Sequence, residues 1–172
     1  MKDTQSSRLG IVTLDGDNAV LAFERRLHHP IEAVWKAITE PKELSKWHLQ
    51  KANVEGEVGG AVEFFSGNDR VTGNVLAWEP PRVFEHEWKV DRPGFPLVEY
   101  GVIKWELIAD GDSTILKLTH RDLTKQSVYN FAPGSHALLD RLEAYLDGTP
   151  PPDWRSRSEE LRKIYSQLNR FA

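Results

Sequence analysis

The spacing of apolar residues predicts two short helices in the first third of the chain. After Pro30, apolar residues recur every three or four positions and therefore share one face of a helix. They are Ile31, Val34, Trp35 and Ile38. Proline fits the first turn of a helix, because its missing N–H would have no partner there. A second short helix therefore begins at Pro41, with Leu44 and Trp47 on one side.

Short β-rich runs predict a sheet on both sides of these helices. A tight hairpin turn is predicted at Asp15-Gly16-Asp17-Asn18. Its two arms are residues 11–14 and 19–23, and the second arm continues to about Leu27. From Ala52 to Asp122, β-rich runs alternate with turn residues, as in an antiparallel meander. We expect strands near 52–56, 61–66, 70–79, 82–90, 97–108 and 113–122.

Helical periodicity returns toward the C-terminus. The segment Ser135–Asp147 carries one apolar stripe, and Gly148 follows it as a residue that ends helices. The stripe consists of Leu138, Leu139, Leu142, Tyr145 and Leu146. Pro150-Pro151-Pro152 forms a stiff linker to a last helix, for which Ser156 and Glu159 form a candidate capping box.

Composition and charge narrow the class of protein. The 172 residues include 22 Lys and Arg, 26 Asp and Glu, and no cysteine, which gives a net charge of −4. A chain of this size forms one domain with a sufficient core, and the missing cysteines exclude a disulfide scaffold and a thiol nucleophile. The charge argues against a general nucleic-acid-binding surface. We find no signal peptide and no membrane-spanning run, so we expect a cytoplasmic protein.

The common catalytic and phosphate-binding motifs are absent from the sequence. It has no His-Glu-x-x-His metal motif and no Gly-x-Ser-x-Gly nucleophile elbow. The run Gly56-Glu57-Val58-Gly59-Gly60 lies between two predicted strands and not before a helix, so we interpret it as a turn. The unusual feature is the aromatic content of six Trp, seven Phe and four Tyr, which must fill a core or line a pocket.

The order of elements and several short strings resemble one known family. The strings are Phe23-Glu24-Arg25-Arg26-Leu27, Val34-Trp35, Ile38-Thr39-Glu40-Pro41, Leu44 through Trp47, Val58-Gly59-Gly60, Gly73-Asn74-Val75-Leu76, Glu79-Pro80-Pro81-Arg82 and Leu116-Lys117-Leu118-Thr119-His120. Over roughly residues 10–148, the chain is similar to the family related to the C-terminal domain of the heat-shock protein 90 ATPase activator, within the START-like (SRPBCC) superfamily. At the start of the long helix many members of this family have Gly-Trp, whereas this chain has Gly134-Ser135-His136.

The resemblance implies an α+β helix-grip fold. In this fold a curved antiparallel sheet wraps around a long C-terminal helix, two short helices follow the first strand, and a cavity remains between sheet and helix. We accordingly divide the chain into a disordered or loosely held N-terminus at 1–9, a START-like domain at 10–148, and a proline linker with an extra helix at 149–172. The extra helix either docks on its own protomer or crosses to a second subunit of a homodimer.

Strand parity predicts which side chains face that cavity. Successive residues of a strand point to opposite faces, so Phe84, His86 and Trp88 share one face. If no bulge intervenes, the same alternation extended back from Trp105 places Glu99 on this face as well. The candidate ligand-binding residues are Trp47, Phe64, Phe84, His86, Trp88, Glu99, Trp105, Leu118, His120, Leu138, Leu142 and Tyr145.

This set predicts a site for a small apolar or amphipathic molecule, because apolar walls supply burial while a few polar groups orient the ligand. The competing interpretation is that these side chains simply fill a core. Two other functions stay open: a protein-interaction module that stimulates a partner ATPase such as a chaperone, and an enzyme that uses cavity His and Glu as acid and base. We expect no cofactor and no metal, since a metal on His86 and His120 would need His48 or Glu99 as a third ligand.

Overall fold

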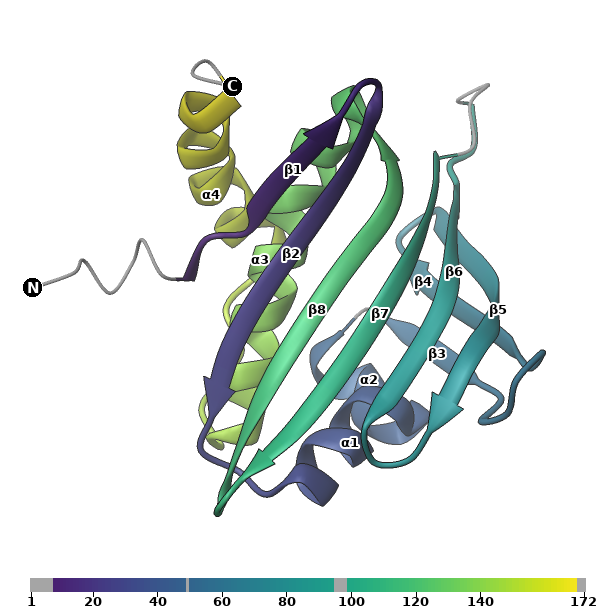
Figure 1. The fold of residues 1–172 in the computed structure, drawn as a ribbon, viewed down its shortest axis with the longest axis vertical. Coiled ribbons are helices and arrows are strands. Elements are labelled where there is room, and N and C mark those ends of the chain that lie inside the picture. Colours follow the sequence, from purple (N-terminus) through teal and green to yellow (C-terminus); the bar gives the residue numbers. More distant parts are fainter. Residues whose placement is uncertain (1–7, 49, 95–98, 170–172) are drawn as a thin grey trace, which may run out of the picture.

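One curved antiparallel sheet organises the protein. This computed structural model describes residues 8–48, 50–94 and 99–169, and within them eight strands pair in the order β1-β2-β8-β7-β6-β5-β4-β3. The strands are β1 (Ile11–Asp15), β2 (Asn18–Leu27), β3 (Lys51–Val54), β4 (Ala61–Ser66), β5 (Asp69–Glu79), β6 (Val83–Asp91), β7 (Glu99–Asp110) and β8 (Ser113–Thr124). Figure 1 shows the helices gathered on one face of this sheet. The α+β helix-grip fold is confirmed.

The predicted hairpin and meander are also confirmed. Asp15 pairs with Asn18 across the first turn, where Gly16 has a φ of +60°, a conformation that glycine adopts without strain. From β3 to β8, each strand pairs with the next one along the chain. The strand predicted at 97–108 begins at Glu99, and its first two residues, 97 and 98, lie outside the described part of the chain.

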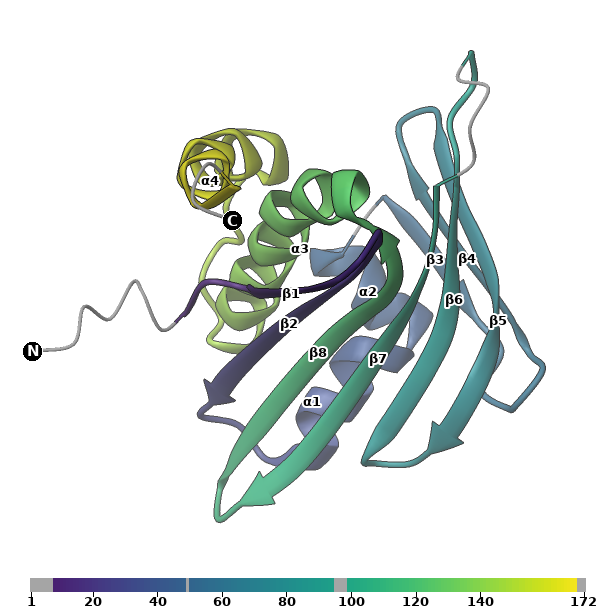
Figure 2. The ribbon, with the colours of Figure 1, turned by 45° about the horizontal axis from the view of Figure 1, so that its top comes forward.

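Two register shifts accompany the curvature of the sheet. One lies where β2 pairs with β8, with the extra residue in β8 between His120 and Leu123, and the other lies in β5 between Val75 and Ala77. An extra residue in one strand bends that strand and increases its local twist. The sheet therefore curves around the long helix, as Figure 2 shows.

Helices α1 (Ile31–Thr39) and α2 (Pro41–Trp47) lie where the apolar spacing predicts them. Pro41 occupies the first turn of α2, in agreement with the role assigned to it from the sequence. The Trp47 side chain is fully buried, and its indole N–H donates to the carbonyl oxygen of Ala37 at 2.9 Å. This bond fixes the two helices to each other.

The long helix α3 (Lys125–Leu146) begins ten residues before the predicted start at Ser135, so that boundary is wrong. A capping box explains the earlier start. The hydroxyl of Thr124 accepts from the Ser127 backbone N–H at 3.0 Å, and the Ser127 hydroxyl accepts from the Thr124 N–H at 2.9 Å. Pro133 lies inside the helix, although an interior proline removes one helical hydrogen bond.

Helix α4 (Trp154–Asn169) packs against α3, and Figure 2 shows it beside that helix. The capping box predicted at Ser156 is wrong, because the Asp153 carboxylate accepts from both the N–H and the hydroxyl of Ser156 at 2.9 Å. Asp153 therefore begins the helix. At the far end of α4, the buried Tyr165 hydroxyl accepts a hydrogen bond from the Gly10 N–H at 2.8 Å.

A polar cluster around Asp140 of α3 connects α4 to the start of the chain. Asp140 contacts Arg8 at 3.1 Å, Arg157 at 2.8 Å and the buried Arg25 at 3.5 Å. Burial by itself would raise the pKa of Asp140, but Arg157 and the other cations hold that pKa below its usual value. Segment 1–7 of the predicted N-terminal part lies outside the described residues.

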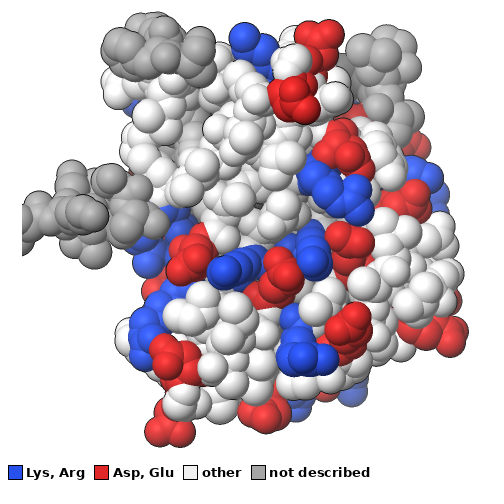
Figure 3. All heavy atoms as spheres, in the orientation of Figure 1, with Lys and Arg blue, Asp and Glu red and all other residues white. Residues whose placement is uncertain are grey.

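The outer face of the sheet carries charges of both signs. Figure 3 shows Lys and Arg intermixed with Asp and Glu over its lower half. Cross-strand ion pairs contribute to this pattern, including Arg121 with Glu85 at 3.5 Å and Arg70 with Glu63. No helix in the described ranges is long and apolar enough to cross a membrane.

Candidate functional site

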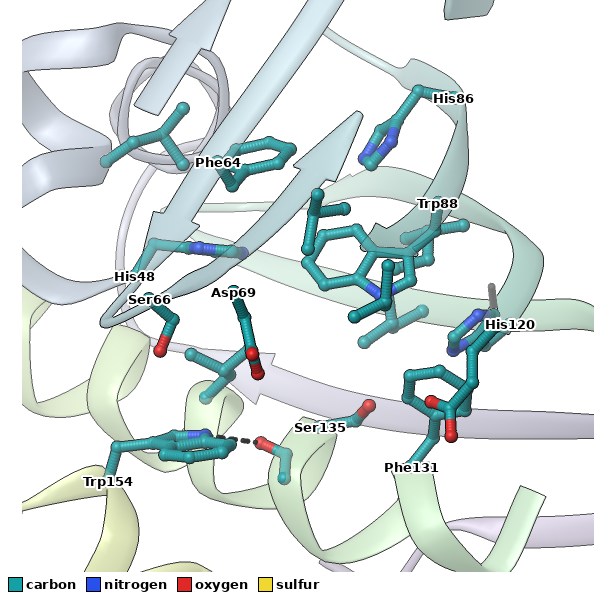
Figure 4. Close-up of a pocket in the computed structure, with 18 of the residues that line it drawn as sticks. His48, Phe64, Ser66, Asp69, His86, Trp88, His120, Phe131, Ser135 and Trp154 are labelled. Carbon is teal, nitrogen blue, oxygen red and sulfur yellow. Dashed lines mark hydrogen bonds between the residues drawn. The ribbon is translucent and has the colours of Figure 1, made fainter. Parts of the chain in front are cut away.

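A cavity of about 390 Å³ lies between the concave face of the sheet and α3. Figure 4 shows aromatic and imidazole side chains that point into it from several elements. The predicted residues that line it are Phe64, Phe84, His86, Trp88, Glu99, Trp105, Leu118, His120 and Leu138. They come from β4, β6, β7, β8 and α3, so the fold brings together residues that are far apart in the sequence.

Strand alternation explains why these side chains share the cavity. In β6 every second residue is buried, including Phe84, His86 and Trp88, while the residues between them are partly exposed. The pairing of β6 with β7 has no register shift, and Trp88 lies opposite Gly101 in it. The parity extended from Trp105 therefore holds as far as Glu99.

Aromatic rings form a continuous wall on one side of the cavity. The His48 ring stacks on Phe64 with centroids 4.8 Å apart, and Phe64 lies 5.5 Å from Trp88. His86 lies 4.8 Å from Phe84 and 6.1 Å from Trp88. Such a wall buries the apolar body of a ligand and offers ring faces for stacking.

Several buried polar atoms on this wall have no hydrogen-bond partner among the described residues. They are the indole nitrogen of Trp88, Nδ1 of His48, and both ring nitrogens of His120. A buried polar atom without a partner costs about 1–3 kcal/mol, so native proteins usually satisfy such atoms with protein, water or ligand. The residues that carry these atoms, Trp88, His48 and His120, all line the cavity.

His86 has a defined tautomer. Its Nδ1 lies 2.9 Å from the carbonyl oxygen of Glu87, and because a carbonyl oxygen only accepts, Nδ1 carries the proton. Burial lowers the pKa of His86 to about 4, so the ring is neutral at physiological pH. Its Nε2 is then a hydrogen-bond acceptor.

The two other cavity histidines are neutral as well. Burial lowers the pKa of His48 to about 3, and repulsion from His86 acts in the same direction. Burial likewise lowers the pKa of His120 to about 3, again with a contribution from His86. The interior of the cavity therefore contains polar but uncharged groups.

Charged residues of the lining lie at partly exposed positions. Asp69 at the start of β5 pairs with Arg92 at 3.1 Å, and their side chains are 31% and 44% exposed. Glu99 is half-buried and Arg162 of α4 is exposed. Because these groups contact solvent while His48, His86 and His120 are buried, they mark the opening of the cavity.

Three candidate residues do not line the cavity. Trp47 turns its indole into the α1–α2 contact described above, and its ring packs edge-on against His48 and Trp105, with centroids 5.1 Å and 6.4 Å apart. Leu142 is buried in the core, and the Tyr145 hydroxyl donates to Glu43 of α2. Near its C-terminus α3 thus contacts α2 through Tyr145.

The lining also contains residues that the sequence analysis did not select for the ligand site. They include Ile38, Leu44, His48, Ser66, Asp69, Arg92, Phe131, Ser135, Trp154 and Arg162. His48 was considered only as a metal ligand, although it directly follows the helix that ends at Trp47. Phe131 lies in the unpredicted first half of α3, and its ring is 4.8 Å from that of His120.

Trp154 and Arg162 lie on α4, beyond the predicted domain, and no local pattern placed them near the sheet. The Trp154 indole donates to the Gly134 carbonyl at 3.1 Å. Within the described ranges, no group of three or more His, Cys, Asp or Glu side chains is arranged to hold a metal ion.

A curved sheet that wraps a long helix and leaves a cavity between them defines a START-like helix-grip protein. Comparison with protein families agrees with this class: the model for "Activator of Hsp90 ATPase homolog 1-like protein" matches residues 28–147. The chain belongs to that family. A search of curated proteins finds no match.

Solved structures resemble the fold over most of its length. CalU16 from Micromonospora echinospora has a TM-score of 0.71 at 25% identity, over 93% of this chain and 94% of CalU16. The protein encoded by gene BPP1335 from Bordetella parapertussis has a TM-score of 0.69 at 24% identity, over 90% and 87%. PFC0360w, an HSP90 activator from Plasmodium falciparum, has a TM-score of 0.51 at 24% identity, over 60% and 73%.

Proposed function

We propose that this protein binds a small amphipathic molecule in the cavity between the sheet and α3. The observation that carries the proposal is the combination of an unfilled space of about 390 Å³ with aromatic walls and buried polar atoms that have no partner among the described residues. Ligand sites in proteins have this composition, with volumes that begin near 300 Å³. A core built only for stability would fill the space or leave its lining apolar.

Native mass spectrometry of the protein purified from its source tests the proposal. We expect a small molecule to co-purify with the wild type. In Leu138→Trp the larger side chain fills the cavity from α3, so the adduct should be lost. Leu76→Trp makes the same chemical change at a side chain on β5 that is 41% exposed, and it should keep the adduct.

A neutral fluorescent probe gives a second measurement that needs no natural ligand. N-phenyl-1-naphthylamine should bind to the wild type and to Leu76→Trp with equal affinity, and at least tenfold more weakly to Leu138→Trp. Circular dichroism checks that both variants are folded. Equal probe binding by all three proteins, with no adduct in any of them, would refute the proposal.

The family match favours a second candidate function, the stimulation of a chaperone ATPase. A module of this kind needs an exposed docking surface. The large exposed hydrophobic side chains of the described residues are Ile11, Val58, Leu76, Tyr100, Ile108 and Leu168. An Hsp90 ATPase assay tests this function directly: stimulation by wild type and Leu138→Trp alike would assign the activity to the outer surface and not to the cavity.

A further inference from the structure

Two polar side chains of the cavity lining, Trp88 and His120, lie beside Gly101, whose missing side chain leaves room for the imidazole. Trp88 of β6 lies directly opposite Gly101 of β7, and His120 lies on the next strand, β8. A Cβ atom at Gly101 would lie 2.3 Å from Nε2 of His120, so the imidazole occupies space that any larger residue would need. We call Trp88, Gly101 and His120 the Gly101 notch.

Both side chains of the Gly101 notch have unused hydrogen-bonding capacity. Trp88 is 8% exposed and His120 is 2% exposed, and neither the indole nitrogen nor either imidazole nitrogen has a partner within the described ranges. Figure 4 shows both side chains extending into the same cavity. The indole N–H only donates, whereas a neutral imidazole offers one donor and one acceptor.

None of the charged side chains among the described residues of the cavity lining is buried. The neighbouring His48 and His86 are buried, and burial holds the pKa of each below its usual value, as it does for His120. The charged lining residues lie at the partly exposed opening. A charged group brought to the notch would lose its hydration without gaining an ion pair, which is costly.

We propose that the Gly101 notch binds a hydroxyl group of an uncharged and otherwise apolar ligand. A hydroxyl oxygen accepts from the Trp88 indole, and the same group donates to or accepts from His120, whichever tautomer that ring adopts. The aromatic wall then contacts the apolar body of the ligand. This inference rests on the proposed function, because it requires the cavity to admit a ligand.

Three probes with one ring system separate hydroxyl recognition from simple apolar binding. Naphthalene has no hydrogen-bonding group, 2-naphthol adds an uncharged hydroxyl, and 2-naphthoate adds a charge. Their affinities are measured by quenching of tryptophan fluorescence and by calorimetry for wild type, Trp88→Phe and His120→Leu. Trp78→Phe is the matched control, because the Trp78 ring lies outside the cavity and packs on Trp35 at 5.1 Å.

Wild type should bind 2-naphthol at least tenfold more tightly than 2-naphthoate. Trp88→Phe keeps an aromatic ring but removes the N–H donor together with the five-membered ring of the indole. The affinity for 2-naphthol should therefore fall roughly three- to tenfold more than the affinity for naphthalene. His120→Leu should behave in the same way, and Trp78→Phe should match the wild type. Naphthalene binding thereby reports that the cavity of each variant is intact.

Two results would overturn the inference and leave the proposed function standing. One is an equal loss of naphthalene and 2-naphthol affinity in Trp88→Phe, and the other is tighter binding of 2-naphthoate than of 2-naphthol by the wild type. Failure of the wild type to bind all three probes and N-phenyl-1-naphthylamine would overturn both proposals together.

Discussion

Acidification should destabilise this fold strongly, because its cavity histidines are neutral only while they are buried. In the unfolded chain a histidine titrates near its ordinary pKa of 6.5, whereas burial lowers the pKa of His86 to about 4 and those of His48 and His120 to about 3. Below pH 6.5 the unfolded state therefore binds more protons than the folded state. The stability these groups contribute is complete above that pH and is lost as the pH falls toward 4 and 3.

The size of the loss follows from these pKa values. At pH 5 each buried histidine is still neutral while its unfolded counterpart is protonated, which lowers the free energy of unfolding by about 2 kcal/mol for each ring. The three cavity histidines together lower the free energy of unfolding at pH 5 by about 6 kcal/mol. Burial also lowers the pKa of His136 to about 4, so it adds to the loss. The total free energy of unfolding of a typical domain is only about 5–15 kcal/mol.

Urea denaturation followed by tryptophan fluorescence at about pH 7.5 and about pH 5 measures this effect. The midpoint should fall by at least about 3 M urea for a dependence of about 2 kcal/mol per M. Because His136 contributes as well as the three cavity histidines, His120→Gln should reduce the difference between the two pH values by roughly a quarter. His28→Gln removes an exposed imidazole and serves as the control. Equal midpoints at the two pH values would refute the assignment of neutral, buried cavity histidines.

Three further substitutions test the packing. Gly101→Ala should cost about 1–3 kcal/mol of stability in urea denaturation, because its Cβ displaces His120; an unchanged midpoint would contradict that close contact. Trp47→Phe leaves the Ala37 carbonyl without its donor and should cost about 1–3 kcal/mol, and a neutral effect would show that the bond contributes nothing. Asp140→Ala leaves a buried arginine unpaired, so calorimetry should show a loss of about 3–5 kcal/mol, whereas a stabilised variant would argue against a buried ion pair.

Local periodicity was sufficient to predict most elements of the fold. The alternation through Phe84, His86 and Trp88 identified the inward face of β6, because a half-buried strand requires it. The start of α3 was missed, since Pro133 interrupts the helical pattern and the capping box at Thr124 uses a serine where the usual signal is Glu or Gln.

The cavity itself depends on tertiary packing that no local pattern contains. Trp47, Leu142 and Tyr145 share their apolar or aromatic character with the lining residues. Tertiary contacts turn two of them away from the cavity, Trp47 toward Ala37 of α1 and Tyr145 toward Glu43 of α2. Conversely, His48 enters the wall because its ring stacks on Phe64 of β4, a contact between residues of separate elements.

Trp154 of α4 fits closely against Gly134 of α3. A Cβ at Gly134 would lie 3.0 Å from the Trp154 ring, so the appended helix and the bare backbone of α3 are matched to each other. The family match ends at residue 147, yet Trp154 and Arg162, which follow it, also line the cavity. A change in the segment after residue 147 would therefore alter part of the cavity lining without altering the sheet.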